Sequence, residues 1–293
     1  MGWALDVTHR LPPFLPEGGI VRIFLPMFFL STLACSGAKP EDNAPESETP
    51  QVPAPPTPSS GTYIEDSKAL NNAHSLEVVV TWNDIPASVM RSPGLDSCGN
   101  DAPAPVPFYI REKKRTVNAL LSTLIRIDGI EKGSPIEELS PAIQIRDCTI
   151  SPRIAVASAK STANFTIVNL DEKPHTLVVE KITEQEAETV LKTRLAVVGQ
   201  RAKIQLDSYG LYRVRMDALP YGDVYIFKPQ HPYVAIPDEN GVATFNQVPK
   251  GDYTIRAWHP PVTPGGPSLR VKRPTTINSE SRARLEIPIE AKN

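Results

Sequence analysis

The chain has 293 residues, of which 31 are proline and three are cysteine, and its formal net charge is −2. Proline at about twice its usual frequency of ~5% excludes a mainly helical bundle, because an interior proline removes a hydrogen-bond donor and clashes with the preceding turn. The near-neutral charge disfavours nucleic acid as a partner, since phosphate binding needs a local excess of lysine and arginine.

The first part of the chain has the pattern of an export signal. Arg22 precedes an apolar run at residues 23–30, and small residues then lead to Cys35. The run is too short to span a membrane, which takes roughly 20 apolar residues, but it fits the core of a signal peptide, so we expect residues 1–34 to be one. Thr32–Cys35 resembles the bacterial lipobox, which makes Cys35 the predicted lipidation site and membrane anchor.

Residues 1–20 do not have the basic character of a leader, because they carry two acids against one arginine together with several prolines and glycines. Translation from Val21 would give a compact leader. We therefore predict that residues 1–20 are a misannotated start.

A proline-rich tether follows the predicted anchor. Residues 36–60 contain seven prolines and no aromatic residue, so they cannot bury enough apolar surface to offset the entropy of ordering. We expect residues 35–72 to comprise the lipidated cysteine and a disordered tether. Ser36 after the cysteine resembles lipoproteins sorted to the outer membrane. The predicted location is therefore the cell envelope, at an outer membrane and facing the periplasm or the outside.

The remainder of the chain has the pattern of an all-β protein. Short β-branched runs alternate with turns rich in Pro, Gly, Asn and Asp, which predicts β-sandwich material. One segment, Glu184–Lys192, is rich in Glu and Ala and predicts a short helix. The expected strands are Leu76–Trp82, Leu120–Ile127, Ile143–Ile145, Asn164–Asn169, His175–Ile182, Leu195–Val198, Leu211–Met216, Val224–Lys228, Val242–Phe245, Asp252–His259 and Leu285–Ile289.

Two cysteines, Cys98 and Cys148, remain after the lipid-bearing one. In an exported protein they most simply form a disulfide, which would close a loop of about 50 residues and stabilise the fold by about 4 kcal/mol. A metal-binding or redox pair is the alternative. Histidines stand at expected strand ends or turns, at His175, His231 and His259, but no HExxH or paired CxxC spacing supports a zinc site.

The segment Phe165–Val179, FTIVNLDEKPHTLVV, resembles the strand and turn that carry the first copper histidine of plastocyanin-like cupredoxins. The resemblance places His175 at that histidine, with Asn169 and Asp171 shaping the turn. A second segment, His231–Pro260, is similar to a stretch of exported proteins labelled methylamine-utilisation or carboxypeptidase-regulatory-like. In that family Cys98 and Cys148 also fall at the positions of the two cysteines.

The same resemblance implies that the copper site is degenerate. These cupredoxins carry Cys-x-x-His-x-x-Met before the last strand, and a type 1 centre needs the thiolate, imidazoles and a weak axial sulfur. Here Met216 falls at the cysteine, Leu219 at the histidine and Gly222 at the methionine. We therefore expect the protein to have no cofactor.

The resemblance also implies the domain organisation. Residues 74–135 together with 228–290 are expected to form a transthyretin-like sandwich, and residues 140–227 a cupredoxin-like sandwich between its halves. Two units in series are the alternative arrangement.

The predicted function is a non-catalytic, lipid-anchored binding or structural module, because no nucleophile elbow or spaced carboxylate pair is visible. Its partners would be the membrane and an envelope protein or polymer. The alternative is a copper- or zinc-binding protein that uses His175 with His231 or His259. A third option is glycan recognition by a local concentration of tyrosines, namely Tyr209, Tyr212, Tyr221, Tyr225 and Tyr233.

Overall fold

The computed structural model describes residues 62–82, 109–111, 118–183, 186–216, 223–262, 266–278 and 283–289. In this part of the chain every regular element is a strand except one short 3₁₀ helix, η1 (Ser67–Leu70). The predicted all-β class is therefore confirmed. Within the described ranges no helix has the length and apolar character needed to cross a bilayer. The predicted signal peptide, the lipidation site and the tether up to residue 61 lie outside them.

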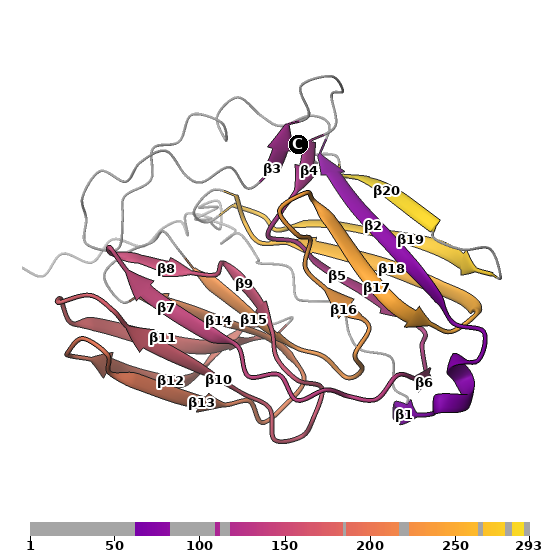
Figure 1. The fold of residues 1–293 in the computed structure, drawn as a ribbon. Helices are drawn as coiled ribbons and strands as arrows, with labels where there is room; N and C mark the ends of the chain where they lie inside the picture. The colour runs from indigo at the N-terminus through magenta and orange to yellow at the C-terminus, as the bar shows by residue number, and fades with distance from the viewer. Residues whose placement is uncertain are drawn as a thin grey trace, which may run out of the picture. The chain divides into compact units, whose positions relative to one another are not determined.

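One sandwich combines strands from both ends of the described chain (Figure 1). A four-stranded sheet has the order β16-β5-β18-β19, and a second sheet has the order β17-β2-β4-β3, with β20 also paired to β2. Their apolar faces share one core, which includes Trp82, Ile125 and Phe245. The strands are β2 (His74–Trp82), β3 (Tyr109–Arg111), β4 (Asn118–Leu120), β5 (Leu124–Asp128), β16 (Val234–Ala235), β17 (Val242–Val248), β18 (Gly251–His259), β19 (Leu269–Ile277) and β20 (Ala283–Ile289).

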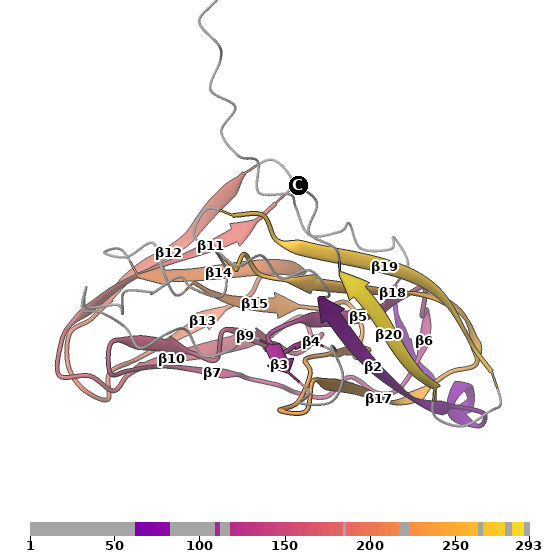
Figure 2. The same ribbon diagram turned by 90° about the horizontal axis from the view of Figure 1, so that it is seen from above.

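The other sandwich is built from a continuous stretch of chain, which Figure 2 shows from above. Its sheets have the orders β13-β10-β7-β8 and β12-β11-β14-β15-β9. A second core, which includes Phe165 and Ile226, lies between them. The strands are β7 (Ala142–Arg146), β8 (Thr149–Ser151), β9 (Ile154–Val156), β10 (Asn164–Asn169), β11 (His175–Ile182), β12 (Ala187–Leu195), β13 (Arg201–Gln205), β14 (Gly210–Met216) and β15 (Val224–Lys228). A small parallel pair, β1 (Ile64–Glu65) with β6 (Lys132–Gly133), completes the described strands.

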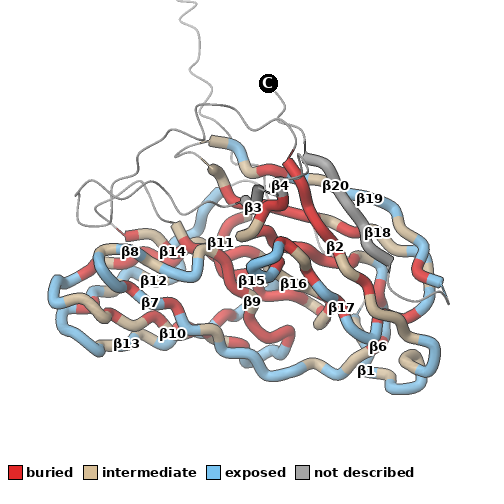
Figure 3. The backbone as a smooth tube through the Cα atoms, turned by 45° about the horizontal axis from the view of Figure 1, so that its top comes forward, coloured by how far each residue is buried: buried red, intermediate tan, exposed pale blue. Residues whose placement is uncertain are grey.

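The outer faces of the two sandwiches meet through a third apolar cluster. The sheet of β12, β11, β14, β15 and β9 contributes Leu211, Tyr225 and Phe227, and the sheet of β5 and β18 contributes Leu124 and Trp258. Strand periodicity explains this, because alternate residues face opposite sides of a sheet. The inward residues of these strands fill the two cores, whereas their neighbours in sequence fill the contact between the sandwiches. Figure 3 shows buried segments running through both sandwiches.

The predicted helix at Glu184–Lys192 is wrong. Residues from Ala187 to Leu195 form strand β12, which pairs with β11 in antiparallel register. The Glu and Ala content favours a helix only weakly, and the backbone partners offered by the edge of β11 outweigh that propensity. The predicted strand at Leu195–Val198 is also replaced, because β12 ends at Leu195 and the amide of Gln200 closes a turn onto the carbonyl of Val197.

Candidate functional site

The turn between β10 and β11 holds the histidine predicted as a remnant copper ligand. His175 is 6% exposed, and its Nε2 lies 2.9 Å from Oδ2 of Asp171. The same carboxylate accepts hydrogen bonds from the backbone amides of Asp147 at 2.6 Å and Cys148 at 3.0 Å. Asp171 therefore fixes the imidazole and, at the same time, ties the β7–β8 turn to the β10–β11 turn.

Asn169 organises this turn from inside. It is fully buried, its side-chain oxygen accepts the amide of Asp171 at 2.9 Å, and its amide nitrogen donates to the carbonyl of Lys173 at 3.0 Å. A carboxylate that orients an imidazole is also the usual companion of a metal-bound histidine. The contacts of His175 alone therefore fit either a structural residue or a ligand, and the neighbouring positions decide what the site can do.

The position predicted for the copper thiolate is occupied by a core residue. Met216 is 6% exposed and packs in the apolar core of its sandwich. In the β11–β14 pairing it lies opposite Leu177, two residues along the strand that begins at His175. A thioether has no proton to lose and cannot supply the thiolate of a type 1 centre. Leu219 and Gly222, the two other positions predicted to be degenerate, lie outside the described residues.

The two alternative histidines have separate environments. His231 forms a cluster of three rings with Tyr63 and Tyr233, whose centroids lie 6.0 and 6.1 Å from its own and 6.3 Å from each other, and burial lowers the pKa of His231 to about 4. His259 is fully buried at the end of β18, its Nδ1–H donates to the carbonyl of Pro260, and burial lowers its pKa to about 3. In the described ranges, no group of three or more His, Cys, Asp or Glu side chains could hold a metal ion.

The remaining predicted residues are placed as follows. Cys148 lies in the β7–β8 turn and is not a free thiol. Cys98 lies outside the described residues, so the Cys98–Cys148 disulfide stays a prediction. Three of the five tyrosines considered for glycan binding, Tyr212, Tyr225 and Tyr233, are buried, whereas Tyr209 is 43% exposed and Tyr221 is not described. The described tyrosines therefore do not form an exposed aromatic platform.

A charged cluster on the outer face of the five-stranded sheet was not predicted. Glu180 is 5% exposed and accepts hydrogen bonds from Arg213 at 2.7 and 2.9 Å and from Arg215 at 3.0 and 3.2 Å. Burial lowers the pKa of Arg213, but its hydrogen bond and charge pairing with Glu180 outweigh this effect and raise the pKa. Burial also raises the pKa of Asp223, which lies 3.9 Å from Arg213.

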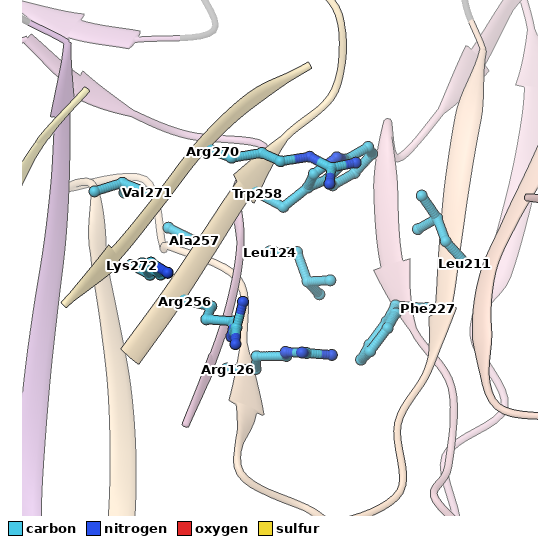
Figure 4. Close-up of a pocket in the computed structure, with 10 residues that line it drawn as sticks. All are labelled: Leu124, Arg126, Leu211, Phe227, Arg256, Ala257, Trp258, Arg270, Val271 and Lys272. Carbon is cyan, nitrogen blue, oxygen red and sulfur yellow. The ribbon is translucent and has the colours of Figure 1, made fainter. Parts of the chain in front are cut away.

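A cavity of about 290 Å³ opens between the outer faces of the two sandwiches (Figure 4). One side is apolar and consists of Leu124, Leu211, Phe227 and Trp258. The basic side chains that line it are Arg126, Arg256, Arg270 and Lys272, and no lining residue is acidic. We call this cavity the basic pocket.

One acidic residue beside the basic pocket, Asp128, forms ion pairs with two of its arginines. Asp128 contacts Nε of Arg126 at 2.8 Å and also hydrogen-bonds to Arg256. Arg126 is 7% exposed, and burial lowers its pKa while the charge of Asp128 acts in the opposite direction. Figure 4 shows Arg126 extended toward Phe227, and Arg270 alongside Trp258. The sequence gives little signal for this site, because Leu124–Asp128 and Gly251–His259 each contain one arginine between apolar residues and are distant in the chain.

Comparison with solved structures finds partial likeness to copper proteins. A copper-containing nitrite reductase from Thermus scotoductus SA-01 is 20% identical over 32% of this chain and 23% of its own, with a TM-score of 0.24. A purple cupredoxin from Nitrosopumilus maritimus is 16% identical over 30% of this chain and 98% of its own, with a TM-score of 0.25. No protein-family model matches the sequence, and no curated protein matches it either.

Proposed function

We propose that this protein is a non-catalytic binding module of the cell envelope, anchored by a lipid on Cys35, whose second sandwich has the frame of a copper site without its copper chemistry. The proposal joins the sequence pattern of the leader and tether to the geometry around His175. It assigns the imidazole a structural role, in which Asp171 holds the ring and two neighbouring backbone amides.

The observation that carries the proposal is the burial of Met216. A copper thiolate must stand where the metal can reach it, and its position here belongs to a residue packed among aliphatic side chains. Without a thiolate, the soft ligand that favours copper electron transfer is missing. The predicted outer-membrane location follows from Ser36 and belongs to the same proposal.

Metal loading of the full-length protein tests the absence of copper chemistry. We expect less than one equivalent of copper to remain after incubation with Cu(I) or Cu(II) and dialysis, and no thiolate-to-copper absorption band. His175→Ala should not change the amount retained, and His74→Ala, which alters a histidine on the other sandwich, is the matched control. One equivalent of copper that is lost in His175→Ala and kept in His74→Ala would overturn the proposal in favour of a metal-binding protein.

Replacement of Cys35 tests the anchor. The unmodified chain should fractionate with membranes and incorporate a labelled fatty acid, whereas Cys35→Ser should do neither. Cys148→Ser is a control for the general loss of a cysteine and should remain labelled. Labelling of Cys35→Ser at the level of the natural sequence would contradict the predicted lipidation site.

A further inference from the structure

The basic side chains of the pocket form rows across the strands. In the β5–β18 pairing Arg126 lies opposite Arg256, and in the β18–β19 pairing Arg256 lies opposite Lys272. Three cations are therefore cross-strand neighbours on one face. The adjacent row runs from Leu124 through Trp258 to Arg270 in the same two pairings. The face thus has a basic row beside a row that is largely apolar.

A row of like charges opposes the stability of a sheet. Like charges directly opposite each other on neighbouring strands are destabilising, and the buried guanidinium of Arg126 adds a desolvation cost. Asp128 pairs with Arg126 and Arg256, so it compensates only part of this charge. The protein as a whole has a net charge of −2, so these neighbouring cations do not reflect an overall excess of positive charge.

The apolar side of the basic pocket is packed into the contact between the two sandwiches. Trp258 meets the ring of Tyr225 edge to face at a centroid distance of 5.1 Å, and both belong to the cluster that joins the sandwiches. Phe227 and Leu211 face this wall from the other sandwich (Figure 4). The volume of about 290 Å³ lies just below the range of about 300–1,000 Å³ typical of small-molecule sites, which favours a small ligand.

We propose that the basic pocket binds a small amphipathic carboxylate, with its apolar body between Trp258 and Phe227 and its carboxylate on the basic row. This inference deepens the proposed binding function by naming a site and a ligand class, and it rests on that function. Guanidinium groups present planar, paired donors that match a carboxylate. A cleft of one charge sign with apolar walls also concentrates ions of the opposite sign.

Equilibrium dialysis of the full-length protein in dilute detergent tests the proposal, with naphthoate as the probe and its fluorescence as the readout. Naphthylmethanol has the same apolar body without the charge and serves as the neutral analogue. The variant Arg270→Gln/Lys272→Gln removes two exposed cations of the pocket. Its matched control, Arg273→Gln/Lys203→Gln, removes two exposed cations elsewhere, since Arg273 is next to Lys272 on β19 but faces the other side of the sheet.

We expect one equivalent of naphthoate to bind, naphthylmethanol to bind at least about 10-fold more weakly, and the pocket variant to lose about 10-fold in affinity for naphthoate. The control variant should stay within about twofold of the natural sequence, because its charges lie outside the pocket. Absence of naphthoate binding would overturn the inference, as would equal binding of the alcohol or equal losses in both variants. Copper retention, the test of the proposed function, does not involve the pocket, so the two failures are distinguishable.

Discussion

The cluster of Glu180 with Arg213 and Arg215 gives a direct test of how burial sets the strength of an ion pair. The side chain of Glu180 is 6% exposed, whereas the side chains of Arg213 and Arg215 are 22% and 41% exposed. Glu180→Gln would remove the carboxylate that pairs with both arginines and leave Arg213 with the longer contact of 3.9 Å to Asp223. Removing one partner of a buried pair costs about 3–5 kcal/mol. Since the arginines keep some contact with solvent, we expect Glu180→Gln to lower the free energy of unfolding by about 2–4 kcal/mol.

Arg215→Gln is the matched comparison, because it removes the more exposed partner and leaves Arg213 paired with Glu180. We expect it to cost less than about 1 kcal/mol, as is usual for a solvent-exposed pair. Urea unfolding monitored by circular dichroism measures both values, and an unchanged m-value shows that the denatured state is comparable. Equal losses in the two variants, or a loss below about 1 kcal/mol in Glu180→Gln, would refute the reasoning from burial.

Three further predictions concern single residues. Burial lowers the pKa of His231 from 6.5 to about 4, so between these pH values the unfolded chain binds a proton that the native chain does not. Up to about 3 kcal/mol of the free energy of unfolding should therefore be lost as the pH falls from 6.5 to 4. His231→Phe should reduce this loss, as measured by urea titrations at pH 7 and 4.5. Asp171→Ala removes the acceptor of three hydrogen bonds and should cost about 2–4 kcal/mol, with Asp171→Asn costing less because one oxygen remains. Lys228→Met should cost about 1–3 kcal/mol in thermal unfolding, since the carbonyls of Ser161 and Leu206 lose their donor.

A stability loss at low pH that is the same in His231→Phe and the natural sequence would contradict the first of these. Equal costs for the two Asp171 variants would contradict the second, because the second variant keeps an acceptor. Unchanged thermal unfolding in Lys228→Met would contradict the third, since the carbonyls of Ser161 and Leu206 would then need no donor.

Strands with an apolar pattern were predictable from the sequence. The predicted bounds Asn164–Asn169, His175–Ile182 and Val224–Lys228 coincide with β10, β11 and β15. Each is rich in β-branched or aromatic residues and ends at a clear turn signal, so local propensity and burial act in the same direction.

Strands at the edge of a sheet were harder to predict, because many of their residues are polar and exposed to solvent. Strand β19 was missed because its sequence, LRVKRPTTI, is basic and contains Pro274. Charged residues and proline are typical of an edge strand, where one row of backbone groups needs no partner. The residues of strand β12 predict a helix for a related reason, since its first four residues are all exposed and the alternation of more buried with exposed residues begins only at Leu191.

The two candidate sites also differ in whether their residues are close together in the sequence. The turn around His175 was visible in the sequence because Asn169, Asp171 and His175 lie within one turn. The basic pocket was not, because its walls come from β5, β14, β15, β18 and β19, which only strand pairing and the packing of two sandwiches bring together.

The two regions also differ in what their charges achieve. Around His175, the two carboxylate oxygens of Asp171 accept three hydrogen bonds, two from backbone amides and one from the imidazole. In the basic pocket, by contrast, Asp128 pairs with Arg126 and Arg256 but the facing row also contains Lys272. Hydrogen bonds that are satisfied internally stabilise a fold, whereas a like-charged row beside an apolar wall gains stability when an anion binds. In our proposal, recognition therefore belongs to the basic pocket and structural support to the turn around His175.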